Sequence, residues 1–261
     1  MVTYPIYSGA GNTFVIVEGC FRKESIPDIC DRFDTDGLLL LSGSAVGDVF
    51  VRFFNRDGSE AESCGNGLRC LARYCYSKWG KKEVVMESGF GIYHALYLGS
   101  DYISVNMTKP SWDLQRDIVV DLGEDLFVGH FINTGVPHFV IFVADVNDVD
   151  VNVLGSKIRN HEIFSPKGVN VDFISGVKNF GRELLVRTYE RGVERETFAC
   201  GTGALAGALF CNKIYGIGSP IDMKTYAGEV LEIIFDDKWE KILCNGPAVK
   251  IAEKSFENCC V

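Results

Sequence analysis

The chain lacks the features that would place it in a membrane or on nucleic acid. No apolar run approaches the roughly 20 residues that cross a bilayer. The N-terminus has neither the basic start nor the unbroken apolar core of a secretory signal. Positive charge is scarce, with 26 Lys and Arg against 35 Asp and Glu and a net charge of −9. Such a surface repels nucleic acid and anionic membranes, so we predict a cytoplasmic protein with neither partner.

Zinc-binding patterns are also missing. The four histidines are scattered and no Cys-x-x-Cys pair occurs, so we predict no metal site. Ten cysteines are nevertheless present, in a chain longer than disulfide-rich secreted domains usually are. Because free cysteine is often a small buried apolar residue, we expect most of them to lie in the core.

Short apolar runs broken by Gly, Asp and Asn dominate the chain. Their length and their β-branched or aromatic content predict strands. The runs are Phe14–Val17, Leu38–Leu41, Val49–Phe54, Tyr102–Val105, Phe139–Val143, Val171–Ile174, Leu184–Thr188 and Val230–Phe235. Clear helical spacing follows Cys64 and Cys200, where it predicts one apolar stripe packed on a core. Many strands and few helices indicate a mixed α/β, or α+β, fold.

The two predicted helices belong to an internal repeat. Segments Glu62–Tyr74 and Phe198–Phe210 both contain Cys-Gly-x-Gly ahead of a helical pattern, with the cysteines 136 positions apart. A weaker echo relates Gly11–Val17 to Val136–Phe142. These repeats predict two similar halves.

The boundary between the halves is predicted where Met107-Thr-Lys-Pro-Ser interrupts the strand pattern. The N-terminal half is then residues 1–108 with 247–261 and carries Cys64. The C-terminal half is residues 109–246 and carries Cys200. We expect the last segment to return to the first half and complete its sheet.

A Cys-Gly-x-Gly turn before a helix has two chemical consequences. The N–H groups of the first helical turn and the helix dipole favour a carboxylate ligand there. The same field favours thiolate over thiol, which predicts a cysteine more acidic than a free one. Two such turns facing one cleft would put a sulfur on each face of an α-carbon. One sulfur would remove a proton and the other would return one.

At these residues the chain resembles the diaminopimelate epimerases. Segment Phe54–Tyr74 resembles the first signature of that family, and Tyr189–Gly192 followed by Glu196–Ala204 resembles the second. Further matches occur in the family's order at Gly9–Phe14, Cys30–Arg32, Asp36–Leu40, Pro137-His138 and Gly168–Phe173. The resemblance implies two pseudosymmetric halves, each a curled, mostly antiparallel sheet around a central helix, with the active site in the cleft between them.

The resemblance also implies the reaction. It is the epimerisation of LL-2,6-diaminopimelate to the meso form, for lysine and peptidoglycan precursors, with no pyridoxal phosphate, other cofactor or metal. Cys64 and Cys200 match the acid/base pair. The matches to residues that offer N–H groups to the α-carboxylate are Gly65, Asn66, Gly201 and Thr202. The matches to residues that hold the other polar groups of the substrate are Asn12, Asn55, Asn170, Glu190 and Arg191.

Arg191 suits a distal carboxylate because its guanidinium donates two parallel hydrogen bonds. His138 matches a histidine near the cysteines that helps to set their protonation, although a lone histidine is more often structural.

Three departures from the family pattern bear on the substrate. Val136 stands where the family usually has Asn, segment 30–37 is shorter, and segment 192–196 has one extra residue. The alternatives are therefore a racemase of another amino acid, such as glutamate, or an amino-acid-binding module without turnover. A redox sensor based on the two thiols is a further alternative. A homodimer is one assembly open to the chain.

Overall fold

The computed structural model describes residues 1–123, 125–177 and 183–256. The chain divides into two compact units. Unit 1 comprises Met1–Asn106 and the segment that begins at Asn245, and unit 2 comprises Met107–Cys244. Residues 257–261, which the sequence assigned to the first half, lie outside the described residues, as do Cys259 and Cys260. No helix in the described part of the chain has both the length and the apolar composition of a membrane span.

Unit 1 is a curled sheet with one helix inside it and another outside. Its elements in chain order are β1 (Val2–Gly9), β2 (Asn12–Glu18), α1 (Ile26–Phe33), β3 (Gly37–Ser42), β4 (Val49–Asn55), β5 (Glu60–Ala61), α2 (Gly65–Trp79), β6 (Glu83–Ser88), β7 (Gly91–Gly99), β8 (Tyr102–Asn106) and, from the chain end, β18 (Val249–Phe256). Strand pairs β2–β3 and β4–β6 are parallel, and the other pairs whose registers are resolved are antiparallel.

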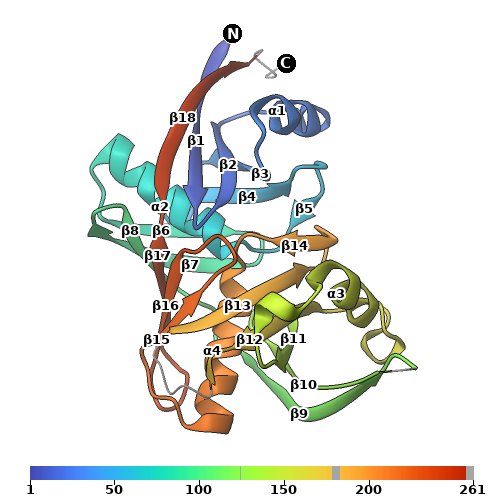
Figure 1. Ribbon diagram of the computed structural model, residues 1–261. Helices are drawn as coiled ribbons and strands as arrows, with labels where there is room; N and C mark the ends of the chain where they lie inside the picture. Colours follow the sequence, from blue (N-terminus) through green and yellow to red (C-terminus); the bar gives the residue numbers. More distant parts are fainter. Residues whose placement is uncertain (124, 178–182, 257–261) are drawn as a thin grey trace. The chain divides into compact units, whose positions relative to one another are not determined.

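The end of the chain completes this sheet. Strand β18 pairs antiparallel with β1, from Val2 opposite Phe256 to Ser8 opposite Val249. Figure 1 shows the two strands side by side, one from each end of the chain. The return that the sequence predicted for its last segment is thus confirmed.

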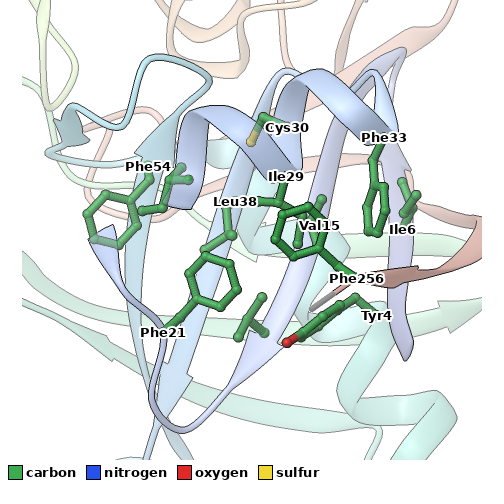
Figure 2. Packing of buried hydrophobic residues seen from close by; sticks show 12 residues of the cluster. Tyr4, Ile6, Val15, Phe21, Ile29, Cys30, Phe33, Leu38, Phe54 and Phe256 are labelled. Atoms are coloured by element: carbon green, nitrogen blue, oxygen red, sulfur yellow. The ribbon is translucent and has the colours of Figure 1, made fainter. Parts of the chain in front are cut away.

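Alternation along the strands of unit 1 supplies two apolar faces. Val15 and Val17 of β2 join a buried cluster under α1, to which that helix contributes Ile29 and Phe33. Figure 2 shows this cluster, with Phe256 of β18 packed edge-on against Phe33. The opposite face of the sheet covers α2, which contacts β1, β2, β6, β7, β8 and β18.

Unit 2 repeats this arrangement. Its elements are β9 (Ser111–Asp121), β10 (Leu126–Asn133), β11 (Pro137–Phe142), α3 (Val151–Arg159), β12 (Asn170–Ser175), β13 (Glu183–Glu190), β14 (Arg195–Thr197), α4 (Gly201–Tyr215), β15 (Ile221–Lys224), β16 (Val230–Phe235) and β17 (Ile242–Pro247), the last containing the chain boundary between the units. Pairs β11–β12 and β13–β15 are parallel, joined through α3 and α4 as β2–β3 and β4–β6 are joined through α1 and α2. The expected mixed fold of two similar halves is confirmed.

Helix α4 is the central helix of unit 2, and it differs from its expected form. The sequence predicted one apolar stripe, but every residue from Gly203 to Cys211 is buried. The reason is that strands surround the helix, because it contacts β10, β11, β12, β13, β15 and β16. A helix that is buried all round carries apolar or small residues all round.

Two shorter helices, α1 and α3, were not predicted. They have eight and nine residues, too few for a strong helical period. Their start signals are present in the sequence, however. Pro27 lies in the first turn of α1, and the Asp150 side chain accepts a hydrogen bond from the Val153 N–H at 3.1 Å to cap α3.

Candidate active site

Cys64 is the N-cap residue of α2. Its backbone is extended, at φ −147° and ψ 105°, and its sulfur accepts a hydrogen bond from the Gly67 N–H at 3.3 Å. The Leu68 N–H donates to the Cys64 carbonyl at 2.9 Å. Because an α-helix supplies no acceptor of its own to its first N–H groups, those of Gly65 and Asn66 are oriented to bind an anion.

Asn12 is brought to this helix start by close backbone packing. Gly9 is its partner across the β1–β2 turn, and a Cβ at Gly9 would lie 2.7 Å from the Asn66 carbonyl oxygen. The turn therefore abuts the first turn of α2 because Gly9 has no side chain. The buried Oδ1 of Asn12 has no hydrogen-bond partner among the described residues, which leaves it to accept one from a ligand.

Asn55 ends β4 at the same edge of the sheet, since Gly37 pairs with both Phe14 and Asn55. Its side-chain amide donates to the Ser59 hydroxyl at 3.0 Å. Asn66 is buried in the first turn of α2, and its Oδ1 accepts a hydrogen bond from the fully buried Arg69 at 2.5 Å. Arg69 belongs to the first family signature but was assigned no role, and the structure shows that it orients Asn66.

Cys200 occupies the equivalent place in unit 2, as the N-cap residue of α4 with φ −126° and ψ 109°. Its sulfur lies 3.4 Å from the Thr202 hydroxyl, and the Ala204 N–H donates to its carbonyl at 2.9 Å. The Thr202 carbonyl accepts a hydrogen bond from the Thr134 hydroxyl at 3.0 Å, which ties the first turn of α4 to the end of β10.

The environment of the Cys200 thiol corrects one expectation from the sequence. Burial raises the pKa of this thiol well above its ordinary value, and the carboxylates of Glu190 and Asp172 raise it further. Hydrogen bonds from Thr202 and the Gly203 N–H act in the opposite direction and are the smaller effect. The prediction that this cysteine is more acidic than a free one is therefore wrong, because burial of the thiolate raises the pKa by more than the hydrogen bonds of the helix start lower it.

Asn170, Glu190 and Arg191 gather at one edge of the unit 2 sheet. Asn170 begins β12 and is 3% exposed. Its amide donates to the Pro137 carbonyl at 3.0 Å, and its Oδ1 accepts from the Arg191 N–H at 2.8 Å. Asn170 thus holds the backbone of Arg191 in place, while its second amide hydrogen remains for a ligand.

His138 is fully buried on β11, opposite Asn170 of β12. Its Nδ1 lies 2.7 Å from Oδ2 of the fully buried Asp172. The Thr188 hydroxyl donates to the other oxygen, Oδ1, also at 2.7 Å. Asp172 is not among the site residues that the sequence predicted, although it forms with Asn170 a polar i, i+2 pair in an otherwise apolar run, which places both on one face of a strand.

Both units therefore present the same chemical group, a cysteine ahead of a buried helix start with glycine at the first and third positions of the helix. Comparison with known proteins agrees with this arrangement. The family model for diaminopimelate epimerase matches residues 4–112 and 130–251. The chain belongs to the diaminopimelate epimerase family. It is accordingly an enzyme of the isomerase class.

Relatives in this family match over nearly the whole chain. The diaminopimelate epimerase of Chlamydia trachomatis serovar L2 is 39% identical over 249 residues, which are 94% of this chain and 88% of the relative. The enzyme of Aquifex aeolicus is 39% identical over 269 residues, 94% of each chain. The family resemblance seen in the motifs is thus confirmed.

Solved structures share the fold at low sequence identity. A hydroxyproline epimerase from Agrobacterium vitis superposes with a TM-score of 0.74 at 14% identity, covering 97% of this chain and 90% of that one. A probable proline racemase from Agrobacterium radiobacter K84 reaches 0.73, also at 14% identity, covering 99% and 93%. These likenesses concern the fold alone.

The two cysteines are expected to differ in their reaction with iodoacetamide. At pH 8 we expect Cys64 to be alkylated at least about tenfold faster than Cys200, because the raised pKa of Cys200 leaves little thiolate there. Peptide mass spectrometry over a time course measures both rates, and Cys20 serves as an internal reference for a solvent-exposed thiol. Alkylation of Cys200 as fast as Cys20 would contradict this.

Proposed function

We propose that this chain converts LL-2,6-diaminopimelate to the meso form without a cofactor, with Cys64 and Cys200 as its acid/base pair. The reaction would serve the synthesis of lysine and peptidoglycan precursors. One observation carries the proposal. In a member of this family, each unit places one cysteine as the N-cap of its central helix. Assembly as a homodimer and location in the cytoplasm stay predictions from the sequence.

The two sulfurs divide the work of one proton transfer. An α-proton is weakly acidic, so one cysteine has to act as a thiolate base while the other returns a proton from the opposite face. The raised pKa of Cys200 supports its entry into the reaction as the thiol. Cys64 is then the base in that direction, and the roles exchange in the reverse reaction. The titration belongs to the pair.

Helix N-termini stabilise the charge that develops during this transfer. The first N–H groups of α2 and α4, at Gly65 and Asn66 and at Gly201 and Thr202, are proposed to bind the α-carboxylate of the substrate. Preorganised donors of this kind stabilise an enolate-like transition state without reorganising. Arg191, with its backbone held by Asn170, is proposed to bind the distal carboxylate. Asn12, Asn55 and Glu190 are proposed to hold the remaining polar groups of the substrate.

Proton NMR in heavy water tests the reaction and its substrate together. Reduced protein incubated with LL-diaminopimelate is expected to exchange one α-proton for deuterium and to accumulate the meso isomer. A binding module without turnover would bind the ligand but exchange no α-proton for deuterium. Absence of exchange in reduced, folded protein would overturn the proposed reaction.

Incubation with L-glutamate tests the alternative that the protein racemises another amino acid. Val136 supplies an apolar, half-buried side chain where the family usually has an amide, and this favours a looser choice of substrate. We expect slow formation of D-glutamate by the parent protein, measured by chiral chromatography. We also expect Val136→Asn to reduce it by about tenfold or more, because an amide would restore one hydrogen bond specific to the longer substrate. No D-glutamate above the blank from the parent would remove this alternative.

A further inference from the structure

Apart from its effect on the pKa of Cys200, a buried carboxylate under the start of α4 has no part in the reaction proposed above. Asp172 is fully buried on β12, where its two oxygens accept hydrogen bonds from different partners. Oδ2 lies 2.7 Å from the His138 Nδ1, and Oδ1 accepts from the Thr188 hydroxyl at 2.7 Å. Removing a carboxylate from water costs free energy, so a buried carboxylate is expected to have hydrogen-bond partners for its oxygens.

The position of Asp172 is set by the absence of a side chain on α4. A Cβ at Gly203 would lie 2.2 Å from the Asp172 Oδ1 and 3.0 Å from the Thr188 hydroxyl oxygen. The carboxylate is thus pressed against the first turn of the helix that Cys200 caps. Two carboxylates, this one and that of Glu190, raise the pKa of the Cys200 thiol.

The other ring nitrogen of His138 is unsatisfied. Its Nε2 is buried and has no hydrogen-bond partner among the residues that the structure describes. Buried polar atoms of this kind are rare unless a ligand or a catalytic step uses them. The tautomer of a histidine is set by the hydrogen bond that its other nitrogen makes, and a carboxylate at Nδ1 retains the proton there.

We propose that Asp172 is a positioning residue for the proposed epimerisation, which holds His138 as the Nδ1–H tautomer and so keeps Nε2 as a proton acceptor for the reacting groups. The inference rests on the proposed function for the use of Nε2. The inferred tautomer is independent of the proposed function, because the Asp172–His138 contact is a property of the folded protein. In this arrangement Nδ1–H donates to the carboxylate, and the lone pair of the buried Nε2 is left to accept a proton.

Imidazole nitrogen NMR of 15N-labelled protein at pH 8 tests the tautomer directly. The His138 signal is assigned by its loss in His138→Gln. In the parent protein Nδ1 is expected to be protonated and Nε2 unprotonated. In Asp172→Asn the new amide donates to Nδ1, so the proton is expected to move to Nε2. A parent protein with Nδ1 unprotonated, or with both nitrogens protonated, would overturn the proposal even if Asp172→Asn fails to fold.

Kinetics separate positioning from a purely structural role. Asp172→Asn is expected to lower kcat by about 10–100-fold while KM stays within about twofold, because the substrate-binding groups are untouched. The matched control is Thr188→Val, which removes the other hydrogen bond to the same carboxylate and leaves the Asp172–His138 contact in place. It is expected to keep the parent tautomer and a kcat within about threefold.

Two results would contradict the role of Asp172. One is an unchanged kcat in folded Asp172→Asn. The other is a parallel loss of activity and stability in Asp172→Asn and Thr188→Val with no change of tautomer. Parent protein that exchanges no α-proton in heavy water would instead refute the proposed function, and the nitrogen spectra would still report on the Asp172–His138 contact.

Discussion

Serine at position 64 or position 200 is expected to lower the rate of epimerisation by about 10³-fold, within the range that general acid–base catalysis contributes. A serine hydroxyl is far less acidic than a thiol, so it neither removes the α-proton nor yields one at a useful rate. Each single change is expected to suffice, because each sulfur is proposed to act on one face of the carbon. Deuterium uptake at the α-carbon and formation of the meso isomer, followed by proton NMR, measure both halves of the reaction.

Folding is expected to survive both changes. Serine is a preferred N-cap residue, so Cys64→Ser retains a side-chain acceptor for the Gly67 N–H. The matched controls are Cys75→Ala on α2 and Cys211→Ala on α4, which remove buried thiols from the same two helices. They are expected to keep activity within about threefold. A rate in Cys64→Ser or Cys200→Ser equal to that of these controls would refute the two-cysteine mechanism.

A methyl group at position 203, within unit 2, is expected to lower both the stability and the activity of the enzyme. Its Cβ would lie 2.2 Å from the Asp172 Oδ1, and that carboxylate is held on its other side by His138. Neither group gives way cheaply, so Gly203→Ala is expected to lower the free energy of unfolding by about 2–3 kcal/mol. It is also expected to lower kcat more than about 100-fold, because it displaces the helix start that carries Cys200. Urea unfolding and the deuterium assay measure the two effects.

Gly67 on α2 is the matched position in unit 1. There a Cβ would lie 3.1 Å from the Leu39 Cδ2 and 3.3 Å from ring carbons of Phe53. Apolar side chains shift by a few tenths of an ångström more easily than a hydrogen-bonded carboxylate, and alanine favours a helix over glycine. Gly67→Ala is therefore expected to change the free energy of unfolding by no more than about 1 kcal/mol. Equal destabilisation by the two substitutions would show that the Asp172 network does not constrain α4.

Much of the fold could be predicted because its signals are local. Each of the eight apolar runs named from the sequence contributes to a strand, and α2 and α4 begin directly after Cys64 and Cys200. Helices α1 and α3 were missed because eight or nine residues carry little periodic signal. The single stripe expected for α4 was wrong, because the number of strands that surround a helix is not encoded in the spacing of that helix's own residues.

The candidate site was less completely predictable. The family motifs named Cys64, Cys200 and the polar residues around them, since those residues are consecutive or nearly so in the chain. Asp172 was assigned no role, because its meaning depends on His138, 34 positions away, and on Thr188 across the next strand pair. The available signal was the polar pair Asn170 and Asp172 in an apolar run, and this signal does not indicate which residues hydrogen-bond to Asp172.

The sequence by itself determined the local structure and the reactive groups of short segments of the chain. Cys-Gly-x-Gly before a helical pattern predicts an N-capped helix with a thiol at its start, because capping and glycine backbone freedom act over a few residues. Only the tertiary structure decided the raised pKa of Cys200 and the tautomer that we infer for His138. Both depend on burial and on neighbouring charge, which arise when strands distant in the chain pack against one helix and exclude water from around its first turn.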